Sequence, residues 1–329
     1  MLSYPEIPTV FAISLAVAGF FLLAWSADLF VDGAAVLARA LGINPFIVGM
    51  VIIGFGTSAP ELCVSALSGA AGHSNLSLGN AYGSCVFNIA AILGAAALIH
   101  PIRVKKGIGV AVMLLIAMTL LSCLLVGLGD GFSRRDGVIQ LAAFAVFFGL
   151  YCWWKQKNGG AAEEPTKEEG GTSLGKAVVK LVFGLLLLAG SSHILVWGAV
   201  DLARAFGVSE LMIGLTVVGI GTSLPELASA IASARKGQNE FVLGNIVGSN
   251  MFNTLAVVGL AGTISPFTDI SPWIMRRDLP AILLLTIMIA MFGINWRNRN
   301  EEGIIRRWQG VVWVLVYAVY FGITLKLET

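Results

Sequence analysis

Charged side chains are scarce in this sequence. Only 12% of its 329 residues are Asp, Glu, Lys or Arg, about half the share found in soluble domains, and mean hydropathy is +0.85. An excess of one charge is also missing, because 21 basic against 19 acidic residues leave a net charge of +2, without the basic face that binds nucleic acid. The chain is therefore predicted to lie in a lipid bilayer and to be no enzyme, with no nucleic-acid partner.

Cysteine and histidine are also scarce. The three histidines are dispersed, and the four cysteines lie in or beside apolar runs without paired spacing, which excludes a disulfide framework and a zinc site. We expect no cofactor.

Apolar runs dominate what remains. Ten of them are long enough to cross a bilayer, so the sequence predicts an all-α integral membrane protein with ten transmembrane helices. A polar segment over 155–173 is predicted to link two five-helix halves, 1–154 and 174–329. The runs lie near 10–38, 44–70, 76–99, 108–128, 136–154, 174–204, 209–234, 241–264, 279–295 and 309–326.

Basic residues divide unequally between the two faces that this helix order defines. Six lie on the face of the N-terminus and the other 15 on the opposite face, so the positive-inside rule places the N-terminus outside and the linker in the cytoplasm. The smaller set comprises Arg134, Arg135, Arg204, Arg276, Arg277 and Lys326.

The two halves contain an internal repeat. Residues 41–104 align without a gap to 206–269 at a constant offset of 165, with 23 of 64 positions identical. Five predicted spans separate the copies, and because five is odd the copies must cross the membrane in opposite directions. Inverted repeats are typical of secondary transporters, whose substrate sites lie where the halves meet.

One glutamate in each repeat, Glu61 and Glu226, falls near the middle of its apolar span. A carboxylate at this depth costs several kcal/mol unless it faces a partner, a cavity or water, and neither span contains Lys or Arg. A mobile cation is the partner that this pattern favours. Proline precedes each glutamate, which predicts that the carbonyls of Gly56 and Gly221, four residues earlier, are freed from helical hydrogen bonds.

Hydroxyl and amide groups accompany the glutamates at helical spacing. Such a ligand set, rich in oxygen and free of sulfur and imidazole, suits calcium, which takes 6–8 oxygen ligands, better than zinc. Two carboxylates balance the charge of one divalent ion or of two monovalent ions, which is the minimal requirement for exchanging them. The accompanying side chains are Thr57, Ser58, Ser84 and Asn88 in the first repeat and Thr222, Ser223, Ser249 and Asn253 in the second.

The paired GTSxPE and GNxxGSxxFN segments resemble the two alpha repeats of the calcium/cation antiporter superfamily, with the prokaryotic sodium/calcium exchangers the most similar. The resemblance implies the sodium/calcium exchanger fold and exchange of calcium for sodium by alternating access, with the first and sixth helices sliding across the core. It further implies that the side chains above and the backbone at Gly54 and Gly219 line four adjoining ion sites, in which Glu61 and Glu226 ligate calcium.

The sequence departs from this family at two places. Several members carry aspartate at one or both of the positions held here by Asn88 and Asn253, so this site has fewer potential charges. The first repeat reads GSC where the family usually has GSN, which puts Cys85 in place of an asparagine. We expect this cysteine to alter local hydrogen bonding more than ion identity.

Other interpretations stay open from the sequence. A calcium/proton antiporter or a potassium-dependent one is an alternative, since desolvated glutamates can titrate, and a calcium-permeable channel is less favoured because inverted repeats with broken helices indicate alternating access. The GxGD of residues 127–130, typical of intramembrane aspartyl proteases, lacks a second carboxylate motif. Asp28, Asp32 and Asp201 lie near span ends, where helix-end contacts suffice.

Overall fold

The computed structural model describes residues 7–105, 107–127, 131–158, 174–208, 213, 217, 219–296 and 301–328. These residues are almost entirely helical, and several helices contain a π-helical turn, labelled η. The predicted linker beyond Asn158 and residues 128–130 of the GxGD segment lie outside the described residues. The first half comprises α1 (Thr9–Leu41), α2 (Pro45–Val48), η1 (Gly49–Gly54), α3 (Phe55–Thr57), α4 (Ala59–Ala70), α5 (Ser74–Phe87), η2 (Asn88–Leu93), α6 (Gly94–Ile99), β1 (Ile102–Val104), α7 (Ile108–Gly127) and α8 (Arg134–Asn158).

The second half has a similar order of helices, but its strand lies between the last two helices instead of after the central one. It comprises α9 (Leu174–Ala205), α11 (Gly219–Gly221), α12 (Leu224–Arg235), α13 (Asn239–Met251), η4 (Phe252–Val257), α14 (Val258–Ile264), η5 (Ile274–Asp278), α15 (Leu279–Gly293), β2 (Gly303–Ile305) and α16 (Arg307–Glu328).

Most predicted spans correspond to described helices. Seven helices are long and apolar enough to cross a membrane, and the pair Pro45–Thr57 and Ala59–Ala70, bent by 46°, makes an eighth span. A ninth predicted span corresponds to η5 and α15, whereas the one predicted over 209–234 begins in residues that are largely outside the described part. The structure therefore has the all-helical membrane architecture that the apolar runs predict.

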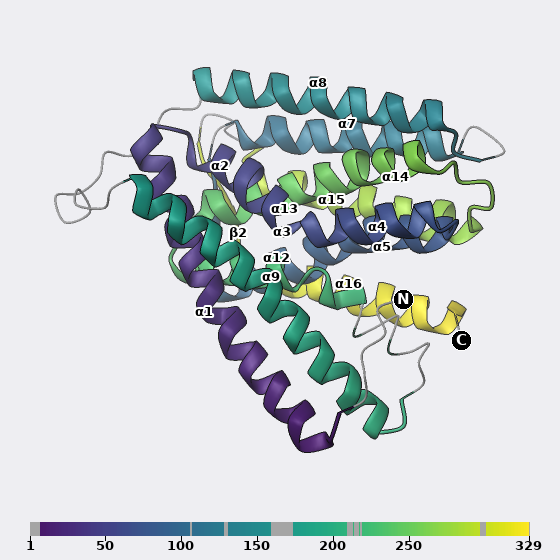
Figure 1. Cartoon of the computed structure of the whole chain (residues 1–329). Coiled ribbons are helices and arrows are strands. Elements are labelled where there is room, and N and C mark those ends of the chain that lie inside the picture. The colour runs from purple at the N-terminus through teal and green to yellow at the C-terminus, as the bar shows by residue number, and fades with distance from the viewer. Residues whose placement is uncertain are drawn as a thin grey trace.

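The two longest helices, α1 and α9, run side by side and cross the rest of the molecule diagonally (Figure 1). Glycines allow this close approach: a Cβ on Gly19 would lie 2.7 Å from the backbone nitrogen of Leu195, and one on Gly184 would lie 2.7 Å from that of Phe30. Gly33 and Gly198 make similar contacts. Small residues at such interfaces let helix backbones pack closely in a bilayer.

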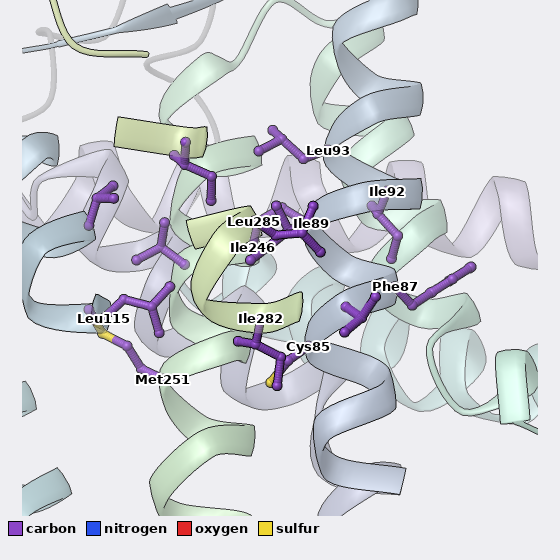
Figure 2. Close-up of a cluster of buried hydrophobic side chains, with 14 of the residues drawn as sticks. Cys85, Phe87, Ile89, Ile92, Leu93, Leu115, Ile246, Met251, Ile282 and Leu285 are labelled. Atoms are coloured by element: carbon purple, nitrogen blue, oxygen red, sulfur yellow. The ribbon is translucent and has the colours of Figure 1, made fainter. Parts of the chain in front are cut away.

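The centre of the molecule consists of the continuous helices α5–η2–α6 and α13–η4–α14. In an apolar stretch of 18 residues from each of these two helices, 72% and 94% of the residues are buried. The corresponding shares are 28% for α1 and 22% for α9. Figure 2 shows apolar side chains around them, with Cys85 of α5 beside Ile282 of α15. These central helices carry the amides predicted to bind ions, whereas the outer helices face lipid.

Two features at the helix ends differ from the predictions. Strands β1 and β2, which we did not predict, pair antiparallel with Ile102 opposite Ile305. Helix α8 continues to Asn158, so its last turn occupies the start of the segment predicted to be linker, and Lys155 is buried there with its ammonium group 5.7 Å from the centre of the Phe46 ring.

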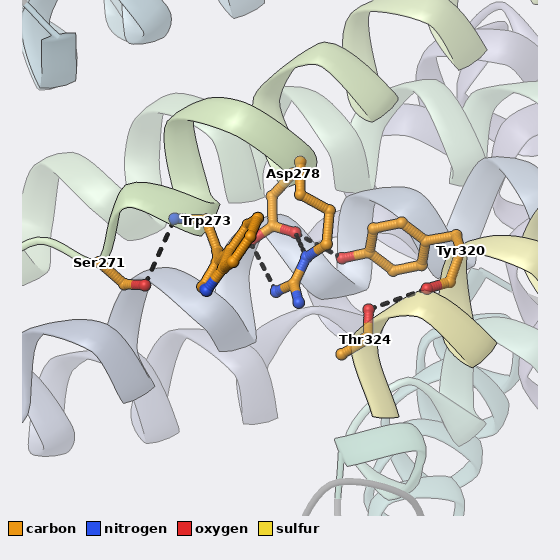
Figure 3. Close-up of polar contacts among 6 residues, drawn as sticks. Ser271, Trp273, Asp278, Tyr320 and Thr324 are labelled. Atoms are coloured by element: carbon orange, nitrogen blue, oxygen red, sulfur yellow. Dashed lines mark hydrogen bonds and ion pairs between the residues drawn. The ribbon is translucent and has the colours of Figure 1, made fainter. Parts of the chain in front are cut away.

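A polar cluster joins the start of α15 to α16 (Figure 3). The buried Asp278 accepts hydrogen bonds from Arg277 Nε at 2.6 Å and from the Tyr320 hydroxyl at 2.8 Å, and Thr324 donates to the Tyr320 carbonyl. Because a buried carboxylate is costly without partners, the bond from Tyr320 to Asp278 holds α16 against the start of α15.

Candidate ion-binding site

The two glutamates predicted to bind ions lie at the start of helices. Glu61 is in the first turn of α4 and Glu226 in the first turn of α12, and both side chains are fully buried. The backbone leaves helical geometry at the preceding Ser58 (φ −82°, ψ 4°) and Ser223 (φ −94°, ψ 9°). The positive end of each helix dipole therefore lies beside a carboxylate and lowers the cost of burying its charge.

The prolines act differently from our prediction. Each span breaks before its proline, so Pro60 and Pro225 occupy the first turn of a new helix, where the missing amide proton would have no partner anyway. The carbonyl of Gly221, predicted to be freed from helical hydrogen bonds, accepts one from the Ser192 hydroxyl of α9 instead, at 3.0 Å. Gly56 faces α9 as well, since a Cβ there would lie 3.2 Å from the Leu185 side chain.

Two reciprocal hydrogen bonds connect the halves of the site. Ser58 of the first half donates to Glu226 Oε1 at 2.9 Å, and Ser223 of the second half donates to Glu61 Oε1 at 2.8 Å. Ser223 Oγ also lies 3.1 Å from Ser84 Oγ. The inverted repeat thus brings both carboxylates to one place, and each is oriented by the opposite half.

Four oxygen atoms of the predicted ion ligands have no hydrogen-bond partner among the described residues. They are Oε2 of Glu61, Oε2 of Glu226, Oδ1 of Asn88 and Oδ1 of Asn253, and all belong to fully buried side chains. A buried polar atom without a partner is costly, and four acceptors from two carboxylates and two amides suit a hard cation.

The other predicted side chains lie around Asn245, a residue that we did not predict. Thr57 Oγ1 lies 3.3 Å from Asn245 Oδ1, Ser249 donates to the Gly54 carbonyl at 3.2 Å, and Asn245 Nδ2 donates to the Glu226 carbonyl at 3.3 Å. The counterpart of Asn245 in the first repeat, Asn80, donates to the Glu61 carbonyl at 3.1 Å. Their identity in the two repeats was the signal that could have found them.

The two halves of the site are not equally enclosed. Thr57 and Gly54 are buried, whereas their counterparts Thr222 and Gly219 are partly and largely exposed. Thr222 donates to the Gly219 carbonyl at 3.4 Å. The site is therefore more open on the side of Gly219 than on the side of Gly54.

The aspartates near the helix ends make contacts outside the site. Lys236, which follows α12, lies 3.1 Å from Asp28 Oδ1 and 2.8 Å from Asp32 Oδ1, and Arg204 contacts Asp201 Oδ1 at 3.3 Å. These are the helix-end pairings that suffice for such residues.

The comparison with known proteins agrees with this geometry. The model of the sodium/calcium exchanger protein family matches residues 11–153 and 176–326. The chain belongs to the sodium/calcium exchanger family. Membership makes it a transporter of the cation exchanger type rather than an enzyme, and both glutamates lie within the matched segments.

Relatives share nearly their full length with this exchanger. It is 41% identical to CaxA of Alkalimonas amylolytica over 87% of this chain and 92% of that one, and 37% identical to the inner membrane protein YrbG of Escherichia coli over 89% and 91%. A solved structure of the sodium-calcium exchanger NCX_Mj, soaked with 10 mM Na⁺ and no Ca²⁺, superposes with a TM-score of 0.82 at 28% identity, covering 96% of this chain and 99% of that one. The exchanger fold follows from this match.

Proposed function

We propose that this protein exchanges calcium for sodium across the membrane, with Glu61 and Glu226 binding the two ions alternately. The observation that carries the proposal is the pair of buried carboxylates, each held at Oε1 by a serine of the opposite half, with no partner for either Oε2 in the part of the chain that the structure describes. The oxygen atoms of Asn88, Asn253, Ser84 and the other predicted side chains complete the coordination.

Charge balance explains why such a site exchanges ions. Two carboxylates neutralise one Ca²⁺ or two Na⁺, while the empty site has an uncompensated charge that is costly in a low-dielectric interior. The loaded states therefore cross between the two faces more readily than the empty state, which couples the flow of one ion to the other. A third bound Na⁺ would give the site a net positive charge, so this balance favours two.

Sodium is favoured over protons by the paired hydroxyls. Thr57, Ser58 and Ser223 are buried beside the carboxylates, and neutral oxygens of this kind ligate a small cation but are not needed to protonate a glutamate. Calcium/proton exchange is the second candidate, because a buried carboxylate can be neutralised by a proton instead of a cation.

The unequal exposure of Gly54 and Gly219 supports alternating access. A site reached from one face at a time requires one half closed while the other is open, and Gly54 is buried while Gly219 is exposed. With the N-terminus outside and the linker in the cytoplasm, as the basic residues indicate, the open side faces outward. The membrane that we propose is a prokaryotic plasma membrane, since the relative YrbG is named an inner membrane protein. A reporter fused after Thr329 should then be external, and a cytoplasmic signal would overturn this orientation.

Calcium uptake into proteoliposomes tests the proposal. Vesicles loaded with sodium should accumulate calcium with saturation, whereas vesicles loaded with potassium or acidic buffer should not. Uptake that follows only a proton gradient would replace sodium by protons, and uptake that needs no countergradient and does not saturate would indicate a channel.

Glu61→Gln and Glu226→Gln should each abolish uptake while the protein still inserts and purifies normally. Asp269→Asn is the matched control, because Asp269 is an exposed acidic residue, and its uptake should equal that of the unmodified protein. Normal uptake by both glutamine variants would show that the ions bind elsewhere.

A further inference from the structure

One position at which the repeats differ, occupied by Cys85 in the first and Asn250 in the second, lies where the two halves meet. The two residues are 165 positions apart, which is the repeat offset, and they contact each other: Asn250 Nδ2 donates to the Cys85 carbonyl at 3.4 Å, and Cys85 Sγ lies 3.8 Å from the Asn250 carbonyl. Both side chains are fully buried. A residue here faces its own counterpart, so the exchange of asparagine for cysteine affects both halves.

The backbone carbonyl of Cys85 determines how the neighbouring amides are oriented. A carbonyl only accepts hydrogen bonds, so Asn250 turns its NH₂ group towards it and its Oδ1 the other way. That Oδ1 accepts a hydrogen bond from Asn88 Nδ2 at 3.1 Å. Asn88 Oδ1 is thereby the free end of the amide, because the reverse orientation would place the two Oδ1 atoms against each other.

Asn253, the counterpart of Asn88, lacks such a partner. Its neighbour by symmetry is Cys85, whose thiol is a weak donor and acceptor and lies 3.5 Å from Thr254 Oγ1 instead. Neither Nδ2 nor Oδ1 of Asn253 has a hydrogen-bond partner among the described residues, although the side chain is fully buried. Its amide can therefore present either end to the site.

We propose that Asn250 is a positioning residue that holds the Asn88 amide with its oxygen towards the ions, and that Cys85 leaves Asn253 free to rotate. This inference rests on the proposed function. Asn88 is then a preorganised ligand, and Asn253 is an adaptable one that turns its oxygen to the cation only when an ion is present. Asn88 and Asn253 occupy the same position of the two repeats, but they contribute unequally to calcium binding.

Equilibrium calcium binding to the purified full-length protein tests this, with reductant present. Asn250→Cys puts in the second half the residue that the first half already has, and it removes the acceptor that orients Asn88. Calcium affinity should fall about three- to tenfold, the range for losing one preorganising neutral hydrogen bond. In an Asn88→Ala background the same change should have no further effect, because Asn250 acts through Asn88.

The reciprocal change tests the role of Cys85. Cys85→Asn supplies Asn253 with an amide partner and should raise calcium affinity by a similar factor, and this gain should vanish in an Asn253→Ala background. Thr254→Val, which keeps the volume but removes the hydroxyl beside Cys85, is the packing control and should leave affinity unchanged. Asn250→Ala provides a second variant if Asn250→Cys does not fold.

The outcomes separate this inference from the proposed function. If the unmodified protein bound no calcium, or if Glu61→Gln bound calcium as tightly as the unmodified protein, the proposed function itself would be refuted. Normal binding combined with an Asn250 effect that persists undiminished without Asn88 would refute the positioning role alone, as would Asn250 variants with unchanged affinity.

Discussion

The contact between α1 and α9 gives a prediction whose size follows from the structure. A Cβ added at Gly184 would lie 2.7 Å from the backbone nitrogen and 2.8 Å from the Cα of Phe30, whereas ordinary contacts between such atoms are about 3.5–4.0 Å. Because the atoms in contact belong to backbone, no side chain can rotate away. Gly184→Ala must therefore move the two helices apart by roughly 1 Å.

Gly190 in the same helix provides the matched comparison, since a Cβ there meets nothing within 4 Å. Overpacking at a tight contact costs about 1–3 kcal/mol, while replacing an unhindered helical glycine by alanine gains up to about 1 kcal/mol. Since Gly184→Ala includes this gain as well, the two variants should differ by the overpacking cost. Thermal unfolding in detergent, followed by tryptophan fluorescence or by size exclusion after heating, measures this difference.

Gly19, which lies 165 positions before Gly184 and makes the equivalent contact in the first half, provides a second test of the same close approach. A Cβ there would also lie 2.7 Å from a backbone nitrogen, that of Leu195, so Gly19→Ala should destabilise the protein as much as Gly184→Ala. Equal melting temperatures for Gly184→Ala and Gly190→Ala would refute the close approach of α1 and α9.

Further variants test other contacts. Ser58→Ala and Ser223→Ala each remove a hydrogen bond to a buried carboxylate, worth roughly 1.5–3 kcal/mol, so both should weaken calcium binding by about tenfold or more in a titration; an effect of only one would contradict the reciprocal arrangement. Tyr320→Phe removes one donor from Asp278 and should lower unfolding stability by about 1–3 kcal/mol without changing calcium affinity. Lys236→Gln breaks partly exposed ion pairs and should cost less than about 1 kcal/mol, and a loss that does not shrink at high salt would count against an electrostatic origin.

The helices and the two buried glutamates could be predicted because their signals are local and repeated. Apolar runs of the length needed to cross a bilayer leave few alternatives, and the matched fold confirms the inverted exchanger architecture. Glu61 and Glu226 were identifiable because a carboxylate within an apolar span is costly and both repeats contain it. The structure then brings the two residues together through Ser58 and Ser223, whose spacing to the glutamates was also visible.

Other features depend on tertiary structure and gave no sequence signal. Thr57 and Thr222 occupy identical motifs, yet only Thr57 is buried, because the enclosure of each half depends on how the helices pack in this conformation. The burial of Lys155 depends on the continuation of α8 and on Phe46, which is far away in sequence. Helical periodicity alone could not distinguish a proline within a helix from one that begins a new helix.

Contacts between residues 165 positions apart recur at a second place, where Ser26 Oγ of α1 lies 3.4 Å from Ser191 Oγ of α9. Such self-facing contacts are those of a twofold homodimer, so the two halves of the single chain meet as two equal subunits would. A mutation in a homodimer always changes both sides of such a contact. In a single chain the two sides can differ, and Cys85 facing Asn250 is such a difference at one position of the repeat.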